Sequence, residues 1–413
     1  MRDVRTLDLS NYKTAKKGKR FVCILIDYFL VVIFSFLIFT IANPIFENMG
    51  YVKTLKTSYE KNQNETVEIL KDTYLQKYDE SNVSFVKVDT SATEYVSSLI
   101  KTSFYKNNKT YYEKKEDKKE EVKIEEKDIC SYLDNGVYVN DRISQYYLNF
   151  RTNNKNSFNK TIDSLSRSDF NKNILKLDST NKDLVDENFD LNDVFYLSSS
   201  NADILSDYVN FNDNAGQNLY IRIKNIYIDA INDGISEVEN YYQPYLDSLT
   251  NFKKNLYAYS RGFDLTCIIC YVIGFLICYL VFPLCFKRGR TLSYKVNSLF
   301  PLRNDNFDLN FGNYLIKDLI LFLDEFSAIF FLPLFIGKLN VLSMPFIFNL
   351  TLFQFIIFSF LFSILSLIFF FISKDNQTIP EFASNTYTVD VTTANEEKKV
   401  MKDMNSLWMK LKK

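Results

Sequence analysis

The chain has 413 residues, a formal net charge of −1 and a mean hydropathy of −0.13, values that would suit a soluble protein. It contains no histidine, which excludes a Ser-His-Asp triad, a histidine general base and every histidine-ligated metal site. Because the charge is balanced and no basic groove is recognisable, we expect no nucleic-acid partner, and we predict neither a cofactor nor a metal. The abundance of Phe (38) and Tyr (28), with plentiful Asn and Lys, is what AT-rich codons encode and indicates a bacterial source.

The first apolar run lies near the N-terminus. A basic segment, residues 1–20, precedes a run over residues 21–44 that Pro44 closes. A membrane span needs about 20 mostly apolar residues, so this run predicts a first transmembrane helix. A cleaved signal peptide is the alternative, but the run is too long, Asp27 interrupts it and no small-residue cleavage site follows.

A long polar segment, residues 45–262, follows the first run. Its two ends carry apolar residues at spacings of three and four, which predict helices. We therefore expect both flanking spans to continue outward as an antiparallel helical hairpin with the middle packed at its tip, and Pro244 to kink or restart the second helix. The apolar stripes comprise Val52, Leu55, Tyr59, Val67, Leu70, Tyr74 and Tyr78, and then Leu219, Ile223, Ile226, Ala230, Ile235, Val238, Tyr242, Tyr245, Leu249, Phe252, Leu256, Tyr259 and Phe263.

Two stretches inside this segment are strongly charged. Residues 113–128 predict a solvated helix or a disordered loop. Residues 178–193 are rich in Asp and Asn, and calcium binding is the less favoured alternative to a solvated loop, because the glycine and ligand spacing of an EF-hand are missing. No catalytic motif is recognisable here, so we predict no enzyme. The surface suits an extracellular protein or glycan ligand, and it equally suits a domain of merely biased composition.

Three more apolar runs predict three more spans, with short connections between them. They cover residues 263–286, 314–337 and 350–373, joined by a loop at 287–313 and a turn at 338–349. Lys and Arg crowd the 1–20 segment and the 287–313 loop, whereas the 338–349 turn carries only Lys338. This bias predicts a multi-pass cell-membrane protein with both termini cytoplasmic and residues 45–262 outside.

The last segment, residues 374–413, is predicted to be a cytoplasmic tail with an amphipathic helix. Lysines occupy one face of that helix, while Trp408 and other apolar side chains occupy the other. A helix of this kind lies on the inner leaflet of the bilayer, which we favour, or it docks onto a cytoplasmic partner.

Small residues recur at helical spacing on two of the spans. They are Cys267, Cys270, Gly274, Cys278 and Cys285 on the second, and Ser359, Ser363, Ser366 and Ser373 on the fourth. Small residues let helices approach closely in lipid, so these stripes predict helix packing within one molecule or between the copies of a homo-oligomer. A metal or redox site at Cys267 and Cys270 is the weaker alternative, because no second cysteine pair accompanies them.

Charged residues inside the predicted spans are the main functional signal. Asp27 lies two turns into the first span, and Lys317, Asp324 and Glu325 lie in the third. An ionisable side chain at this depth normally faces the bundle interior or a water-filled cavity. One hypothesis is a carboxylate site for a proton or cation. The other is a structural ion pair, such as Asp27 with Lys317. If the third span is shifted so that Asp324 and Glu325 lie nearer the cytoplasmic surface, both hypotheses are weakened.

Four short segments resemble the RDD family of membrane proteins, named for one arginine and two aspartates. They run from Arg20 to Asp27, from Gly289 to Lys295, from Leu315 to Asp324 and from Gln377 to Val389. Lys317 replaces an arginine, Ser293 a glycine and Glu381 an aspartate of the family pattern. The likeness covers residues 15–44 and 263–392, and it implies a membrane core that is associated with transport.

Together these features predict a mainly α protein, a four-helix transmembrane bundle with an inserted helix-rich extracellular domain. The leading functional hypothesis is transport of an ion or small solute, in an oligomer because four spans are few for a lone transporter. The alternative is a membrane-anchored binding or scaffolding protein. The candidate transport residues are Arg20, Asp27, Lys317, Asp324, Glu325 and Glu381.

Overall fold

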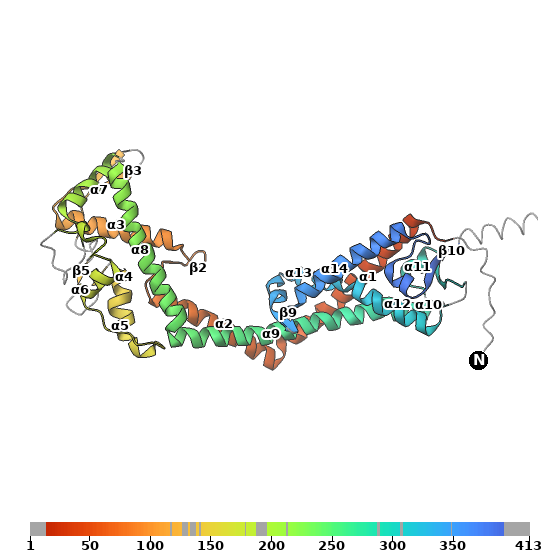
Figure 1. Cartoon of the computed structure of the whole chain (residues 1–413). Helices are drawn as coiled ribbons and strands as arrows, with labels where there is room; N and C mark the ends of the chain where they lie inside the picture. Colours follow the sequence, from red (N-terminus) through yellow and green to blue (C-terminus); the bar gives the residue numbers. More distant parts are fainter. Residues whose placement is uncertain are drawn as a thin grey trace, which may run out of the picture. The chain divides into compact units, whose positions relative to one another are not determined.

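The computed structural model is built mainly from helices, with a few short two-stranded sheets (Figure 1). It describes residues 14–115, 118–125, 131–132, 138–139, 142–177, 179–186, 196–211, 214–286, 290–305, 309–347 and 349–391. The chain divides into two compact units, one of residues 1–57 with 255–413 and one of residues 58–254. The prediction of a mainly α-helical protein is therefore confirmed.

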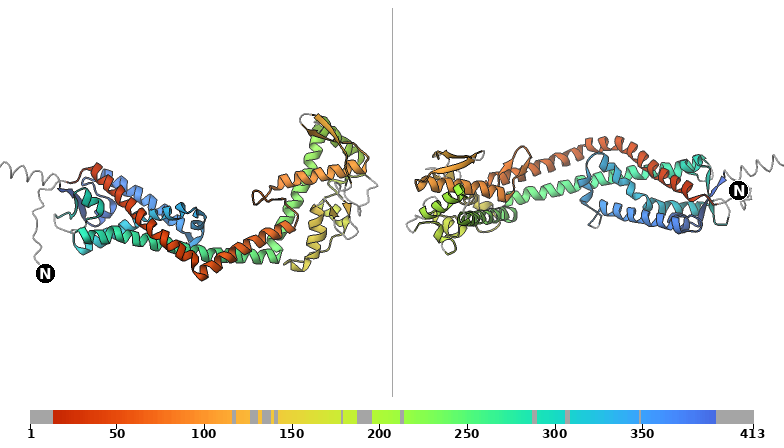
Figure 2. Two further views of the ribbon diagram at one scale, coloured as in Figure 1. Left: turned by 180° about the vertical axis from the view of Figure 1, so that it is seen from behind. Right: turned by 90° about the horizontal axis from the view of Figure 1, so that it is seen from above.

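Three helices are long and apolar enough to cross a membrane in the part of the chain that the structure describes. They are α1 (Lys17–Asn48), the 44 residues from Gln243 to Phe286, and α14 (Leu352–Ile372). The second comprises α9 (Gln243–Leu276), a π-helical turn (Ile277–Val281) and α10 (Phe282–Phe286). These three long helices can be followed in two further views of the ribbon (Figure 2). The helix α1 passes through Pro44, where the sequence predicted its end.

The third predicted span differs from the expectation of one continuous helix. It consists of α12 (Phe311–Asp324), a 3₁₀ helix (Phe326–Phe330) and α13 (Phe331–Phe335). The 14 residues of α12 extend only about 21 Å at 1.5 Å each, short of a hydrocarbon core of about 30 Å. The helix α12 ends at Asp324, with Glu325 as its C-cap, and both of these acidic side chains are buried. The four-helix bundle therefore remains a prediction.

A small sheet and two short helices lie beside the ends of the long helices. Strand β7 (Leu299–Arg303) pairs antiparallel with β10 (Thr386–Asp390), and Thr14 bridges to Val389 on the other side of β10. The helices are α11 (Leu292–Val296) and α15 (Ile379–Ala383). The sequence predicted only a loop and a tail for these segments. The amphipathic helix expected near Trp408 lies outside the described residues.

The connection between α13 and α14 was predicted as a turn. It holds a 3₁₀ helix (Leu339–Ser343) followed by the short hairpin of β8 (Pro345–Ile347) and β9 (Leu350–Thr351). Within the same unit, α1 and α9 run antiparallel, because Phe39 contacts Phe263 while Phe46, later in α1, contacts the earlier Tyr259.

The second unit has a hydrophobic core of its own, formed by α3 (Val88–Lys106), α7 (Ser199–Phe211), α8 (Asn214–Tyr241) and the loops between them. Fully buried side chains such as Leu99, Tyr146 and Ile231 lie at its centre. The helix α8 ends at Tyr241 and α9 begins at Gln243, so the predicted restart at Pro244 is confirmed.

Shorter elements complete this unit. They are α2 (Gly50–Asp72, which begins in the first unit), β1 (Tyr78–Asp79), β2 (Ser84–Phe85), β3 (Tyr111–Lys115), β4 (Lys118–Val122), β5 (Ser131–Tyr132), β6 (Tyr138–Val139), α4 (Arg142–Ser144), a π-helical turn (Gln145–Phe150), α5 (Arg151–Asn153), a 3₁₀ turn (Lys155–Ser157), α6 (Arg167–Asp169), a π-helical turn (Phe170–Ile174) and a 3₁₀ turn (Lys182–Leu184). The β3–β4 hairpin occupies part of the charged stretch for which we predicted a helix or loop.

The acidic stretch 178–193 is described only in part. Within it, Asp183 accepts two hydrogen bonds from Arg222, at 2.6 Å and 2.8 Å. The Arg222 guanidinium, as donor and as charge, holds the pKa of the Asp183 carboxyl below its usual range. This carboxylate therefore pairs with a protein cation, while residues 187–193 of the stretch lie outside the described residues.

Candidate functional site

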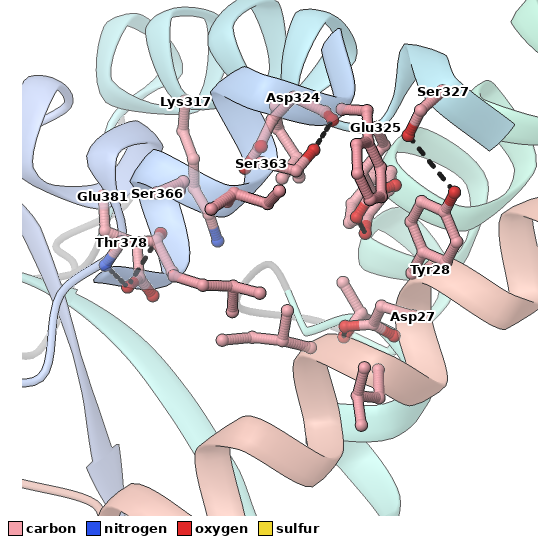
Figure 3. Close-up of a pocket in the computed structure, with 18 of the residues that line it drawn as sticks. Asp27, Tyr28, Lys317, Asp324, Glu325, Ser327, Ser363, Ser366, Thr378 and Glu381 are labelled. Carbon is pink, nitrogen blue, oxygen red and sulfur yellow. Dashed lines mark hydrogen bonds between the residues drawn. The ribbon is translucent and has the colours of Figure 1, made fainter. Parts of the chain in front are cut away.

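A cavity of about 330 Å³ lies in the first unit, between α1, α11, α12, α14, α15 and the π-helical turn after α9 (Figure 3). Five of the six residues predicted as candidates line it, and they come from three of the predicted segments. These five are Asp27, Lys317, Asp324, Glu325 and Glu381. The sixth, Arg20, is buried and contacts Glu381.

Asp27 is buried on α1 and receives a hydrogen bond from the loop before α11. The Thr291 hydroxyl donates to its carboxylate at 2.8 Å, and that same hydroxyl oxygen accepts from the Tyr294 amide as the N-cap of α11. No salt bridge of the described residues joins Asp27 to Lys317, so the structural ion pair that we considered does not form.

The break between α12 and the following 3₁₀ helix is stabilised by side chains from neighbouring helices. The Asp324 carbonyl accepts hydrogen bonds from the Ser359 hydroxyl at 3.1 Å and from the Ser363 hydroxyl. The Ser327 amide donates to the Ser359 hydroxyl at 2.8 Å. A helix can be interrupted in an apolar environment only where such partners satisfy its freed backbone groups. The serines of α14 therefore serve the break, beyond the packing role that their spacing predicted.

The two carboxylates at the break are both buried, and neither has all its oxygen atoms satisfied. The Tyr279 hydroxyl donates to one Glu325 oxygen at 2.5 Å. The other Glu325 oxygen, Oε2, and Asp324 Oδ1 are buried without a hydrogen-bond partner. An unpaired buried carboxylate is costly, so it binds a proton or another cation, or draws in water.

Lys317 reaches into the cavity from α12 (Figure 3). Its amine lies 5.5 Å from the centre of the Tyr294 ring, a cation–π arrangement, and the side chain is 8% exposed. The described residues include no carboxylate within salt-bridge distance of it. The cavity thus holds an amine and several carboxylates that interact through their charges without forming a direct ion pair.

Arg20 and Glu381 form a buried ion pair that ties α1 to α15. Glu381 also accepts hydrogen bonds from the Thr378 amide at 3.0 Å and the Thr388 hydroxyl at 2.9 Å. Burial alone raises the pKa of the Glu381 carboxyl, but the Arg20 guanidinium, the charge of the Lys317 amine and the Thr378 amide bring it below its ordinary value. Arg20 also stacks over the Phe370 ring at 5.3 Å. Glu381 lines the cavity, and Arg20 behind it neutralises its charge.

Comparisons with family models, curated proteins and solved structures find no match to this chain. The described residues also contain no group of three or more His, Cys, Asp or Glu placed to hold a metal ion. The function must therefore be argued from the cavity itself.

The cysteine stripe has the packing role predicted for it, with one exception. Cys267, Cys270 and Cys278 are buried and unpaired, whereas Cys285 is exposed. Gly274 lies so close to α1 that a Cβ atom there would be 2.8 Å from the backbone nitrogen of Ser35. The small residues thus bring α1 and α9 into close contact.

The sequence reasoning missed several polar residues of this unit. Tyr28, Tyr279 and Thr291 line the cavity, and nothing in their spacing distinguished them from core residues. Asp264 was also missed: it is fully buried on α9, and neither carboxylate oxygen has a partner. An acidic residue at the edge of the apolar run of residues 263–286 was the feature of the sequence that could have identified it. Asp264 does not line the cavity.

Proposed function

We propose that this chain transports an ion or small solute across the cell membrane through the carboxylate-lined cavity. In the proposed topology, the interrupted segment from Phe311 to Phe335 is the fourth spanning element beside the three long apolar helices. The Lys and Arg bias of the connecting segments supports cytoplasmic termini and an external 45–262 segment.

The observation that carries this proposal is the break at Asp324 and Glu325. Transporters form their midplane sites at discontinuous helices, where free backbone ends and ionisable side chains face a cavity. Here the break presents two incompletely satisfied carboxylates to a cavity that Asp27 and Lys317 also line. An unpaired buried charge destabilises the fold, and the carboxylates at the break, unlike that of Asp264, belong to residues that line a cavity.

The RDD likeness is consistent with the same proposal. The segments around Asp27, Thr291, Lys317 and Glu381, which carry the likeness, all contribute to the cavity wall. We therefore propose an RDD-like core in which Arg20 and Glu381 form a fixed wall and Asp27, Asp324 and Glu325 handle the transported species. A homo-oligomer remains part of this proposal because the spans are few.

Ion flux in proteoliposomes tests the proposal. Wild type and Asp27→Asn would be reconstituted at matched protein density, with Asp264→Asn as a control carboxylate outside the cavity. We expect cation- or proton-coupled flux that Asp27→Asn abolishes and Asp264→Asn retains. Absent flux would refute transport, and flux that is insensitive to Asp27→Asn would show that Asp27 has no transport role.

A second candidate function is recognition of an external protein or glycan by the unit of residues 58–254. The observation that favours it is the separate hydrophobic core of that unit, which includes residues as far apart as Leu75 and Tyr245. Replacing residues 58–254 with a short linker would remove this function. If the shortened chain retains the full cellular role, the binding hypothesis is wrong.

A further inference from the structure

The charges of the cavity are unbalanced toward the acidic side. Asp27, Asp324 and Glu325 line it together with a single amine, Lys317, while Glu381 is neutralised by Arg20. Two carboxylate oxygens, Asp324 Oδ1 and Glu325 Oε2, are buried without a partner. A positively charged guest would be attracted by these carboxylates, whereas an anion would be repelled by three carboxylates for each lysine.

The size and lining of the cavity disfavour a bare metal ion as the guest. About 330 Å³ lies in the range of small-molecule pockets, and an inorganic cation needs several oxygen ligands close together. No described cluster of three or more such side chains is suitably placed. Most of the remaining lining is apolar or aromatic, as with Ile24, Leu321 and Phe331.

Aromatic side chains lie on the same side of the cavity as the unpaired carboxylates. Tyr279 donates a hydrogen bond to Glu325, and Tyr28 shares a hydrogen bond of 3.2 Å with Ser327, just past the break (Figure 3). Aromatic rings beside carboxylates attract organic ammonium groups through their negative faces. The site thus offers a charged end and an apolar body.

One wall of the cavity also reaches the surface of the apolar helices. Leu25 on α1 and Phe360 and Ile364 on α14 line the cavity, yet they are 38%, 57% and 39% exposed. Both helices are apolar enough to cross a membrane. An amphiphilic guest would therefore meet an apolar edge at which it can enter from the lipid.

Resting on the transport function proposed above, we propose that the cavity binds a small organic cation with an apolar body. Its ammonium group lies against Asp324 and Glu325, and its apolar part lies between α1 and α14. Asp27 supplies a third negative charge, and Lys317 opposes the cation. Removing the lysine charge is therefore expected to strengthen binding of the cation. A variant that merely misfolds would bind more weakly, so the two effects are distinguishable.

Competition binding to the purified full-length protein tests this inference. The probe is radiolabelled benzyltrimethylammonium, and the matched competitor is neopentylbenzene, which has the same shape with carbon in place of the charged nitrogen. We expect unlabelled benzyltrimethylammonium to compete at least about tenfold better than the neutral isostere, a difference of about 1.4 kcal/mol. NaCl and KCl are tested as further competitors of the probe, at one constant ionic strength.

Three variants complete the test. Glu325→Gln is expected to weaken binding about tenfold, Lys317→Gln to strengthen it about tenfold, and Asp264→Asn to leave it unchanged. Equal competition by neopentylbenzene, displacement by sodium or potassium, or weaker binding in Lys317→Gln would overturn the organic-cation assignment.

The binding and flux experiments separate this inference from the transport proposal. Specific binding of the organic cation without any flux would retain the ligand assignment and refute transport. Flux of protons or metal ions that depends on Asp27, without binding of the organic cation, would retain transport and refute the ligand assignment.

Discussion

The buried ion pair between Arg20 and Glu381 allows a quantitative test of the structure. The two side chains are only 1% and 3% exposed, so Arg20→Met leaves the Glu381 carboxylate buried without its cation. Losing one partner of a buried pair costs about 3–5 kcal/mol. Thr378 and Thr388 still donate hydrogen bonds to Glu381, so we expect a loss at the lower end, about 3 kcal/mol.

The matched control is Lys19→Met, one residue earlier on the same helix. Lys19 pairs with Asp390 at 2.8 Å, but its side chain is 27% exposed, so that variant is expected to lose about 0–1 kcal/mol. The assay is the unfolding midpoint of purified protein in one detergent. The double variant Arg20→Met with Glu381→Leu should recover most of the stability, because neither charge of the pair remains. Equal destabilisation by Arg20→Met and Lys19→Met would refute the reasoning.

The same pair predicts a pH dependence. The pKa of Glu381 is lower in the folded protein than its ordinary value, so its contribution to stability is complete above the unfolded pKa of about 4.3. It is lost as the pH falls below that value and through the folded pKa. Unfolding midpoints measured from pH 6 to pH 3 should therefore fall more steeply in wild type than in the Arg20→Met with Glu381→Leu variant. Parallel curves would contradict this assignment.

The remaining predictions concern packing and the helix break. Gly274→Ala should lower the free energy of unfolding by about 1–3 kcal/mol, because its Cβ would meet the α1 backbone. The control Gly18→Ala, with open space around it, should be neutral or stabilising, and unfolding midpoints of the two variants test the difference. Ser359→Ala removes two hydrogen bonds at the break and should cost about 1–3 kcal/mol; an unchanged midpoint would contradict its role. Tyr279→Phe leaves Glu325 without its donor, and proteoliposome flux should fall while the amount of reconstituted protein stays the same.

The sequence by itself determined the helical class, the long apolar helices and the candidate charged residues. These features depend on local properties: the length of an apolar run, the periodicity of side chains, and the rarity of a carboxylate such as Asp27 inside such a run. The restart at Pro244 was predictable for the same reason, because proline lacks the amide proton that a helix interior needs.

Only the tertiary structure decided how the third apolar segment ends and what its charges face. The run of residues 314–337 looks continuous, and it breaks because hydroxyls 35 and 39 residues later in the chain satisfy the Asp324 carbonyl. Likewise, Glu381 pairs with Arg20, 361 residues away, and the Asp27 carboxylate accepts from the Thr291 hydroxyl, 264 residues away, where the sequence had offered Lys317 as a partner. Hydrogen bonds and ion pairs between distant segments depend on how helices pack, and a one-dimensional pattern does not record that packing.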